Sequence, residues 1–310
     1  MQFARVRSGL AESFEDVDAV AVDARGTTLF VSGDADLPMY YRSAMKPFQA
    51  LAGRRAGLKL PDEHLALSCA SHGGFPVHIS IVETILTDAG LSKSDLKCAV
   101  DRPQNPDADR LLAAMGRRHR ESLLHNCSGK HAGWLAACVA AGWDTESYLD
   151  FDHPLQVSVV EILHEFSDVD PEPRGIDGCG APTLRGTIKG LARAFQRLGG
   201  DQEMAPIAMA MARFGALVAD NIHPSGRISL QWGGPVKAGA EGSIGMVRQG
   251  VGIAAKSRTG NSYASAAAVL EVADKLGMLT DSMSEALEDV RRPAVLGGGD
   301  TVGTWELVQA

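Results

Sequence analysis

Residues 19–31 read Ala19-Val20-Ala21-Val22-Asp23-Ala24-Arg25-Gly26-Thr27-Thr28-Leu29-Phe30-Val31. Two short apolar runs flank a polar stretch that contains glycine, which is the pattern of two β-strands joined by a turn. Another strand is expected close to the opposite end of the chain, at 304–308. We therefore expect both ends of the chain to contribute strands to one sheet.

Helical spacing fills most of the sequence between these strands. The first helix is expected from Ser43 to about Gly57, with Pro47 in its first turn, where backbone N–H groups have no partner inside the helix. Asp152 is the expected N-cap of a helix at 154–166. The other expected helices are 76–89, 107–118, 130–141, 182–198, 204–218, 264–276 and 282–290, and a glycine-rich, β-like region spans 227–256.

This order of elements predicts an α+β fold, with a β-sheet built from both chain termini, packed helices and a mainly helical central region at about 60–220. Of the 310 residues, 45% are hydrophobic and 22% are charged, which excludes a disordered, coiled-coil or collagen-like chain. No internal repeat or Pro/Ser-rich linker divides the sequence. Residues 1–310 are therefore expected to form a single domain.

Charge and cysteine content narrow the functional classes. A net charge of -8 without any concentration of Lys and Arg argues against a nucleic-acid partner. No apolar run approaches the roughly 18 residues of a membrane span, and the start of the chain lacks the apolar core of a signal peptide. We expect a cytoplasmic location, where the five cysteines are buried thiols, metal ligands or catalytic groups rather than disulfides.

Ser43 and Lys46 are the first candidate catalytic pair. They lie three residues apart in Arg42-Ser43-Ala44-Met45-Lys46, so a helix presents both side chains on one face. A lysine whose pKa is lowered by burial accepts the proton of a serine and makes that serine a nucleophile. An S-x-x-K tetrapeptide is also found by chance at solvated helix starts, so the pair needs support from other segments.

A second hydroxyl and a candidate base follow an apolar run in Leu67-Ser68-Cys69-Ala70-Ser71-His72-Gly73-Gly74. Small and polar residues closed by two glycines are typical of an element that opens into a loop around a site. Ser71 is the second hydroxyl, and His72 is the candidate base. A turn histidine bonded to the backbone is the alternative explanation of His72.

Two polar clusters contain cysteine. They are His125-Asn126-Cys127-Ser128-Gly129-Lys130-His131, which precedes an apolar helix, and Gly175-Ile176-Asp177-Gly178-Cys179-Gly180-Ala181-Pro182-Thr183. Cys127 and Cys179 are candidates to share a zinc ion with Lys130 or His131 and a water, because thiolates suit zinc. Two buried cysteines beside a polar pocket are the alternative.

The last candidate segments are Gly239-Ala240-Glu241-Gly242 and Lys256-Ser257-Arg258-Thr259-Gly260. Lys256 ends an apolar, β-like run and is a candidate cation of the site. A solvent-exposed lysine at the end of a strand is the alternative.

Together these segments resemble the asparaginase II-like family, the rhizobial-type or class 3 L-asparaginases. The resemblance covers most of the chain, and its five motifs occur in the order of the family. The motifs are Arg42-Ser43-Ala44-Met45-Lys46-Pro47-Phe48-Gln49-Ala50, Cys69-Ala70-Ser71-His72, Asn126-Cys127-Ser128-Gly129-Lys130-His131-Ala132-Gly133, Asp152-His153-Pro154-Leu155-Gln156 and Ile176-Asp177-Gly178-Cys179-Gly180-Ala181-Pro182-Thr183.

The resemblance implies a fold similar to that of serine β-lactamases and glutaminases, and hydrolysis of L-asparagine to L-aspartate and ammonia. It implies two Ser-Lys pairs, Ser43 with Lys46 and Ser71 with Lys256. It further implies that the protein is a homodimer with a zinc site. The implied zinc ligands are Cys127, Lys130 and Cys179.

The implied mechanism begins with attack of Ser43 on the amide carbon while Lys46 takes its proton. N–H groups at the helix start hold the oxyanion, and Ser71 with Lys256 relays a proton to the leaving ammonia. Which of the two serines attacks stays open. Charge complementarity makes Arg42 a candidate partner of the substrate α-carboxylate and Asp177 of its α-ammonium. The other candidate substrate-binding residues are His72, Asn126, His131 and Glu241.

Two alternatives to an asparaginase stay open. The segments Arg258-Thr259-Gly260 and Ala219-Asp220-Asn221 are similar to the K-T-G and S-D-N elements of β-lactamases and D-alanyl-D-alanine peptidases. Relatives of the asparaginase family usually carry acidic residues where this chain has Arg258-Thr259. This departure allows a zinc-stabilised pseudoenzyme that binds an amino acid without hydrolysing an amide.

Overall fold

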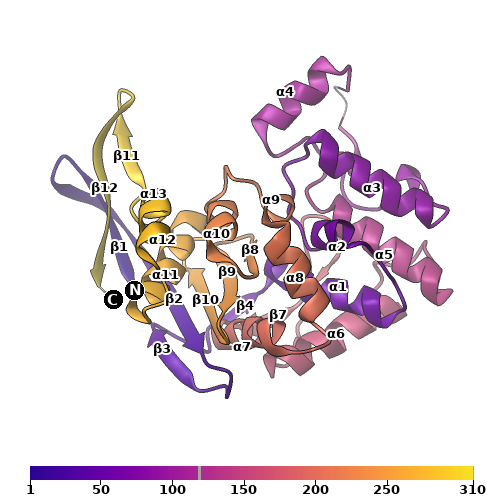
Figure 1. Ribbon diagram of the computed structural model, residues 1–310, viewed down its shortest axis with the longest axis horizontal. Coiled ribbons are helices and arrows are strands. Elements are labelled where there is room, and N and C mark those ends of the chain that lie inside the picture. Colours follow the sequence, from indigo (N-terminus) through magenta and orange to yellow (C-terminus); the bar gives the residue numbers. More distant parts are fainter. Residues whose placement is uncertain (118–119, 310) are drawn as a thin grey trace.

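Both ends of the chain pair in one antiparallel sheet. The computed structural model of the protein describes residues 1–117 and 120–309, and Figure 1 shows the two termini beside each other on the sheet. The strand order is β11 (Ala294–Gly297), β12 (Asp300–Gln309), β1 (Gln2–Arg7), β2 (Leu10–Val22), β10 (Val251–Ser257), β9 (Ser243–Arg248) and β8 (Val236–Gly239), and β3 (Thr28–Ser32) also pairs with β2. The predicted α+β fold with a sheet from both termini is confirmed.

Strand β2 joins the two halves of the sheet, and its second half, from Val17 to Val22, is buried on both faces. Its first half pairs with β1 and its second half pairs with β10. Val20 and Val22 belong to one apolar core, whereas Val17, Ala19 and Ala21 belong to the other. Since successive side chains of a strand point to opposite faces, this alternation calls for a layer of helices on each side of the sheet.

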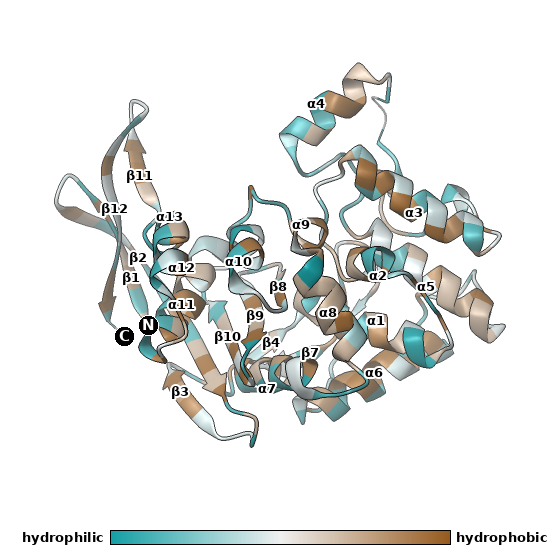
Figure 2. Ribbon diagram, viewed as in Figure 1, coloured by the Kyte–Doolittle hydropathy of each residue, from teal (hydrophilic) through white to brown (hydrophobic). Residues whose placement is uncertain are grey.

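Helix α7 (Ile188–Gly200) supplies one of these layers and α11 (Ser262–Lys275) supplies the other, each contacting β2, β9 and β10. The Thr187 hydroxyl caps α7 by accepting a hydrogen bond from the N–H of Gly190 at 3.0 Å. Figure 2 shows β9 and β10 mostly in the brown of apolar residues. Each large apolar side chain buried in these layers stabilises the fold by roughly 1.5–3 kcal/mol.

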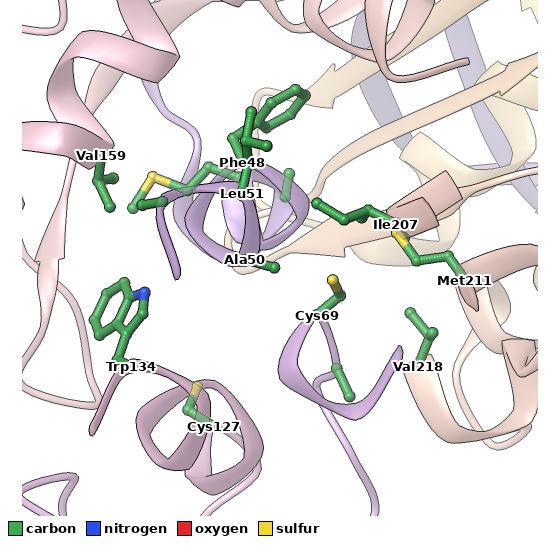
Figure 3. Close-up of a cluster of buried hydrophobic side chains, with 14 of the residues drawn as sticks. Phe48, Ala50, Leu51, Cys69, Cys127, Trp134, Val159, Ile207, Met211 and Val218 are labelled. Carbon is green, nitrogen blue, oxygen red and sulfur yellow. The ribbon is translucent and has the colours of Figure 1, made fainter. Parts of the chain in front are cut away.

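The mainly helical central region packs around α1 (Lys46–Arg55), which contacts α5 (Ser128–Ala141) and α6 (Pro154–Ser167). Figure 3 shows Phe48, Ala50 and Leu51 on α1 within this core, with Trp134 of α5 on one side. The remaining helices are α2 (Asp62–Ser68), α3 (Pro76–Asp88), α4 (Pro106–Ala114), α8 (Ala205–Arg213), α9 (Gly215–Val218), α10 (Pro224–Trp232), α12 (Asp281–Ala286) and α13 (Glu288–Arg291). No helix in the described part of the chain combines the length and apolar character that crossing a bilayer requires.

Two regions differ from the predicted secondary structure. Residues 182–187, predicted as the start of a helix, form the short strands β6 (Pro182–Thr183) and β7 (Arg185–Thr187), because the helix begins only after its cap at Thr187. Residues 227–232, predicted as β-like, belong to α10. Pro224 is the first residue of that helix, a position where the missing N–H of proline costs nothing.

Two helix boundaries also differ. The N-cap of α6 is His153 rather than Asp152: His153 directly precedes the helix, and its Nδ1 accepts a hydrogen bond from the N–H of Leu155 at 3.1 Å. The helix predicted at 107–118 is α4, which ends at Ala114. Arg118 lies outside the described residues, as does position 310 of the predicted single domain. That domain count stays a prediction.

Gly186 allows Tyr41 to enter the core beside the candidate site. Strand β7 pairs with β4 (Pro38–Tyr40), and the fully buried Tyr41 follows directly. A Cβ atom on Gly186 would lie 1.9 Å from the Cζ atom of the Tyr41 ring. The Tyr41 hydroxyl accepts a hydrogen bond from the N–H of Thr187 at 3.3 Å. The ring therefore fixes the chain immediately before Arg42.

Replacing Gly186 with alanine is expected to lower the free energy of unfolding by about 1–3 kcal/mol, because the buried ring or strand β7 must move. Gly178→Ala is the matched control, since no heavy atom lies within 4 Å of the position of its added Cβ. We expect this control to change stability by less than about 0.5 kcal/mol. Urea unfolding measures both values, and a Gly186→Ala protein as stable as the wild type would contradict the packing described.

Candidate active site

A cavity of about 300 Å³ lies where β8 meets the short 3₁₀ helix η1 (Arg42–Met45) and the N-terminal ends of α10 and α11. Its walls include the polar residues Ser43, Ser71, Asn126, Lys237 and Glu241. Sequence analysis singled out four of these five residues and missed Lys237. The cavity is thus the place where the separate motifs come together.

Ser43 and Lys46 begin one continuous helical segment, as their spacing predicted. Helix η1 runs directly into α1, and Lys46 is buried at the junction. The Lys46 amine makes no hydrogen bond to Ser43: it donates to the backbone carbonyl of Ala70 and to the Ser71 Oγ, 3.0 Å away. Among the residues that the structure describes, the Ser43 hydroxyl has no hydrogen-bond partner. Ser43 therefore presents a free hydroxyl to the cavity.

Ser71 lies between two lysine amines. Its Oγ is 3.0 Å from the Lys46 Nζ and 2.9 Å from the Lys237 Nζ. The backbone holds Ser71 in place, because its N–H donates to the Val218 carbonyl at 2.9 Å and it forms a β-bridge with Ala219. The hydroxyl can therefore pass a proton to or from either amine without a large movement.

Burial lowers the pKa of Lys237 well below the usual 10.5, and the neighbouring amine of Lys46 lowers it further. Lys237 is 1% exposed and also donates to the Ala238 carbonyl at 2.7 Å. A low pKa favours the neutral amine, which has a lone pair for the proton of a hydroxyl. Lys237 thus has the environment of a general base.

The expected pairing of Ser71 with Lys256 is wrong. The second lysine beside the Ser71 hydroxyl is Lys237. The Lys256 amine is half-buried and donates to the backbone carbonyls of Glu241, at 2.6 Å, and Ser257. It therefore ties the turn after β8 to β10. Lys237-Ala238-Gly239 on β8 is the signal that would have identified the second lysine, since it is close to the K-T-G pattern.

The segment Arg258-Thr259-Gly260, which the sequence suggested as a K-T-G element, points its first residue elsewhere. The Arg258 guanidinium donates two hydrogen bonds of 2.8 Å to the carboxylate of Asp18 on β2. Asp18 is 2% exposed at its side chain, whereas the side chain of Arg258 is half exposed. The ion pair joins the residue that follows β10 to strand β2.

Arg42 and Asp177, the two predicted partners of the ionic groups of a substrate, bind each other. Arg42 Nε and Nη2 donate to Oδ1 of Asp177 at 3.0 and 2.8 Å. Burial opposes ionisation of Asp177, but the Arg42 guanidinium outweighs it and holds the pKa of the carboxyl below its usual value. Arg42 has a φ of 52°, so the ion pair fixes a left-handed residue immediately before Ser43.

The two predicted histidines lie behind the site rather than in the cavity wall. The Ser128 hydroxyl donates to the Leu123 carbonyl, so His72 must donate to Ser128 through Nε2, at 2.9 Å. Burial lowers the pKa of His72 well below 6.5. His131 is also fully buried, with Nδ1 2.7 Å from the Tyr148 hydroxyl, and burial lowers its pKa to about 4. Both side chains are therefore neutral supports of neighbouring segments.

Asn126 and Glu241 line the cavity, in agreement with their predicted place. The Asn126 Oδ1 accepts a hydrogen bond from the Cys127 thiol at 3.2 Å, and its amide nitrogen has no hydrogen-bond partner among the described residues. Glu241 has a φ of 60° in the turn between β8 and β9. It is the carboxylate of the cavity wall.

Cys127, Lys130 and Cys179 form one buried cluster next to the cavity. The Lys130 amine donates to the Cys179 Sγ at 3.2 Å and lies 4.5 Å from the centre of the Trp134 ring. A hydrogen bond from Cys179 lowers the pKa of Cys127 well below 9.0, and the amines of Lys46 and Lys130 act in the same direction. The cluster therefore makes the Cys127 thiol easier to deprotonate beside the Lys130 amine.

These three side chains fit a zinc ion chemically, because two sulfurs and one amine lie in contact and the Nε2 of His131 is buried nearby without a partner in the described residues. Within 1–117 and 120–309, no three His, Cys, Asp or Glu side chains are grouped in a way that suits a metal. The predicted set differs because lysine supplies one of its donors. Zinc therefore stays a prediction.

Lys237→Met is expected to remove the free-energy cost of burying this amine and, with it, a pH dependence of stability. Because the pKa of Lys237 is lower in the folded protein, the unfolded chain binds more protons in the interval up to pH 10.5, and wild-type stability rises with pH there. The methionine variant lacks this term, so its stability relative to the wild type should fall by more than about 1.4 kcal/mol from pH 7 to 9.5. Urea unfolding at both pH values measures the difference. A difference that does not change with pH would mean that Lys237 has its ordinary pKa.

Comparison with solved structures gives low overall similarity. A crystal structure of Mglu in its glutamate form has a TM-score of 0.45 and 16% identity, covering 84% of this chain and 61% of that one. A Bacillus glutaminase has a TM-score of 0.40 and 12% identity, with 84% and 91% covered. A β-lactamase from Mycobacterium bovis has a TM-score of 0.39 and 12% identity, with 85% and 95% covered. This chain thus spans about 61% of the length of Mglu.

No curated protein matches the sequence. A family model does: the model for L-asparaginase II matches residues 4–307, which includes every residue of the cavity wall and of the cysteine cluster. The chain belongs to the L-asparaginase II family.

Proposed function

We propose that the protein hydrolyses the side-chain amide of L-asparagine to L-aspartate and ammonia. Membership of the L-asparaginase II family supports an amidohydrolase. The observation that carries the proposal is the Ser71 hydroxyl held between the amines of Lys46 and Lys237, next to the free hydroxyl of Ser43 in one cavity. Amide hydrolysis needs a nucleophile, a base and a proton donor for the leaving nitrogen, and these four residues supply all three.

Ser43 is the nucleophile in this mechanism. Its hydroxyl has no partner among the described residues and lines the cavity, whereas the Ser71 hydroxyl is held by two amines. Ser43 Oγ attacks the amide carbon, and its proton enters the network of Lys46, Ser71 and Lys237, where a neutral amine accepts it. The carbonyl oxygen becomes the oxyanion of a tetrahedral intermediate.

Ser71 then delivers the proton to the leaving nitrogen. The C–N bond breaks, ammonia departs and an aspartyl ester remains on Ser43. The amine that holds the extra proton restores the hydroxyl of Ser71, so the network returns to its starting state. Water attacks the ester, its proton takes the same route to Ser43, and L-aspartate is released. Proximity of Ser71 to both Lys46 and Lys237 makes the transfer short in each direction.

Glu241 is the proposed partner of the substrate α-ammonium, because it supplies the carboxylate of the cavity wall. The amide nitrogen of Asn126 is a donor toward the substrate. Arg42 and Asp177 satisfy each other at 2.8 and 3.0 Å, so we assign them to holding η1 and the 175–183 segment together rather than to the substrate. Their ion pair fixes the residue before Ser43.

Zinc would be held by Cys127, Lys130 and Cys179. The ion would supply a positive charge in place of the proton on the Lys130 amine. It would thereby link the N-terminal end of α5 to the segment that carries Asp177 and Cys179. Lysine binds a metal only as the neutral amine, so uptake of zinc releases that proton. A homodimer and a cytoplasmic location complete the proposal, and both stay predictions.

Purified protein is expected to release ammonia from millimolar L-asparagine, with L-glutamine measured in parallel. Ser43→Ala should lower kcat by about 10³-fold or more, since no ester can form. Lys237→Met should lower kcat by about 10²–10⁴-fold, as for a lost general base.

Lys256→Met is the matched control, since it removes an amine of the same kind that donates to backbone carbonyls rather than to Ser71. It should lower kcat by less than about tenfold. An equal loss in the two lysine variants would contradict the place given to Lys237. Ammonia release that survives Ser43→Ala in folded protein would remove Ser43 as the nucleophile. Turnover of a chromogenic cephalosporin without any ammonia from asparagine would favour a β-lactamase, to which Lys237-Ala238-Gly239 is also suited.

Protein purified without chelators is expected to contain about one zinc per chain by elemental analysis. Cys179→Ala should lose the metal, whereas Cys138→Ala, which removes another buried cysteine of the same region, should keep it. Zinc added to the metal-free protein should also release protons. Unchanged zinc content in folded Cys179→Ala protein would rule out this site.

A further inference from the structure

Ser225 is a polar residue of the cavity wall that the proposed mechanism does not use. It is the second residue of α10, 8% exposed, and lies in the same wall as Ser71 and Lys237. Within the described residues, neither its backbone N–H nor its hydroxyl has a hydrogen-bond partner. Two donors left free at one buried residue, both beside a cavity, call for a ligand that accepts them.

The chain holds Ser225 firmly beside the catalytic residues. The β-bridge of Ser71 with Ala219 places residues 219–225 along the cavity. Gly226 then packs against this segment so closely that a Cβ on it would lie 2.0 Å from the carbonyl oxygen of Asp220. The N–H groups of Gly226 and Arg227 bond to the His223 carbonyl, which closes the first turn. Ser225 is thus rigidly placed rather than mobile.

The environment of Ser225 suits an anion. The first N–H groups of a helix point out of its N-terminal end without partners, and the helix dipole makes this end positive. Helix α10 has nine residues, and His223, its N-cap, makes no side-chain cap hydrogen bond. Pro224, the first residue, has no N–H, so the N–H of Ser225 is the first one available. A carboxylate can accept from this N–H and from the hydroxyl together.

We propose that Ser225 at the N-terminus of α10 binds the α-carboxylate of the amino-acid substrate. This inference rests on the proposed function, in which Glu241 receives the α-ammonium. Arg42, which charge alone would select for the carboxylate, is already paired with Asp177. The cavity then recognises the two ionic ends of a free amino acid with a carboxylate and a helix N-terminus. Substrates whose α-carboxylate is blocked lose the second contact.

Equilibrium binding tests the proposal without relying on turnover. The Ser43→Ala protein is titrated calorimetrically with L-asparagine and with L-asparaginamide, in which an uncharged amide replaces the α-carboxylate. Adding Ser225→Asp should weaken L-asparagine binding by about tenfold or more, because two carboxylates then meet. Ser225→Ala, which keeps the N–H, should weaken it by about threefold to tenfold. Binding of L-asparaginamide should change by less than about twofold in both variants.

Val77→Asp is the matched control for the added charge. Val77 is also the second residue of a helix that begins with proline, α3, and it is 47% exposed and outside the cavity wall. A carboxylate at this position of an exposed helix start is favourable, so Val77→Asp should not lower the melting temperature. The melting temperature of Ser225→Asp, measured in the same way, checks that this variant is folded. Val77→Asp should leave the binding of both ligands unchanged.

Three results would overturn the subsite. They are equal weakening of the two ligands by Ser225→Asp, unchanged L-asparagine binding in that variant, and no L-asparagine binding by the parent protein. The wild-type ammonia assay reports separately on the proposed function. A chain that releases no ammonia but loses L-asparagine binding selectively in Ser225→Asp would retain the subsite and require a different activity.

Discussion

The amines of two buried lysines both contact one serine hydroxyl, and the proposed chemistry of the site depends on how much positive charge these two amines can carry together. Lys46 and Lys237 lie 3.0 and 2.9 Å from the same Ser71 oxygen, and both are 1% exposed. Two positive charges separated by roughly 4–6 Å repel by about 3–4 kcal/mol at an effective dielectric constant of 20, before the cost of burial is counted. A single proton shared by the two amines avoids that repulsion. The pair can therefore take up one proton and return it, which is what successive acylation and deacylation steps require.

This arrangement depends on elements that are distant in the sequence. Lys46 belongs to α1 in the helical region, Lys237 belongs to the edge strand β8 of the sheet, and Ser71 follows α2. Gly239 makes the approach of β8 to η1 possible: a Cβ there would lie 2.6 Å from the Tyr41 carbonyl oxygen and 3.1 Å from the Ala44 nitrogen. The residues to which we assign catalysis thus lie at the contact between two separately packed cores. A small shift of β8 against α1 would separate the amines.

The sequence predicts site residues that are close together along the chain, and it does not predict contacts between residues that are far apart in the sequence. Ser43 and Lys46 are three residues apart, so their common helical segment was predictable. Lys256 ends a clear apolar run and is therefore the lysine that the sequence indicates, whereas Lys237 lies in a short strand between glycines and gives no such signal. The register of the sheet shows how near Lys256 is to the place of Lys237. Ser243 on β9 pairs with Lys256 on one side and with Gly239, two residues after Lys237, on the other. The free hydroxyl of Ser225 was not predictable, because the sequence does not reveal which donors stay unpaired.

Charge pairing is also the reason that we assign recognition of the substrate carboxylate to a helix end. Arg42 is bound to Asp177, and Lys130 is bound within the cysteine cluster, so these cations are already compensated. Releasing either one for a substrate would leave a buried partner charge unpaired, a large penalty in a low-dielectric site. The N-terminal turn of α10 has no such partner to lose, because its N–H groups are fixed by the backbone. A helix end can therefore receive an anion without reorganisation of an existing ion pair.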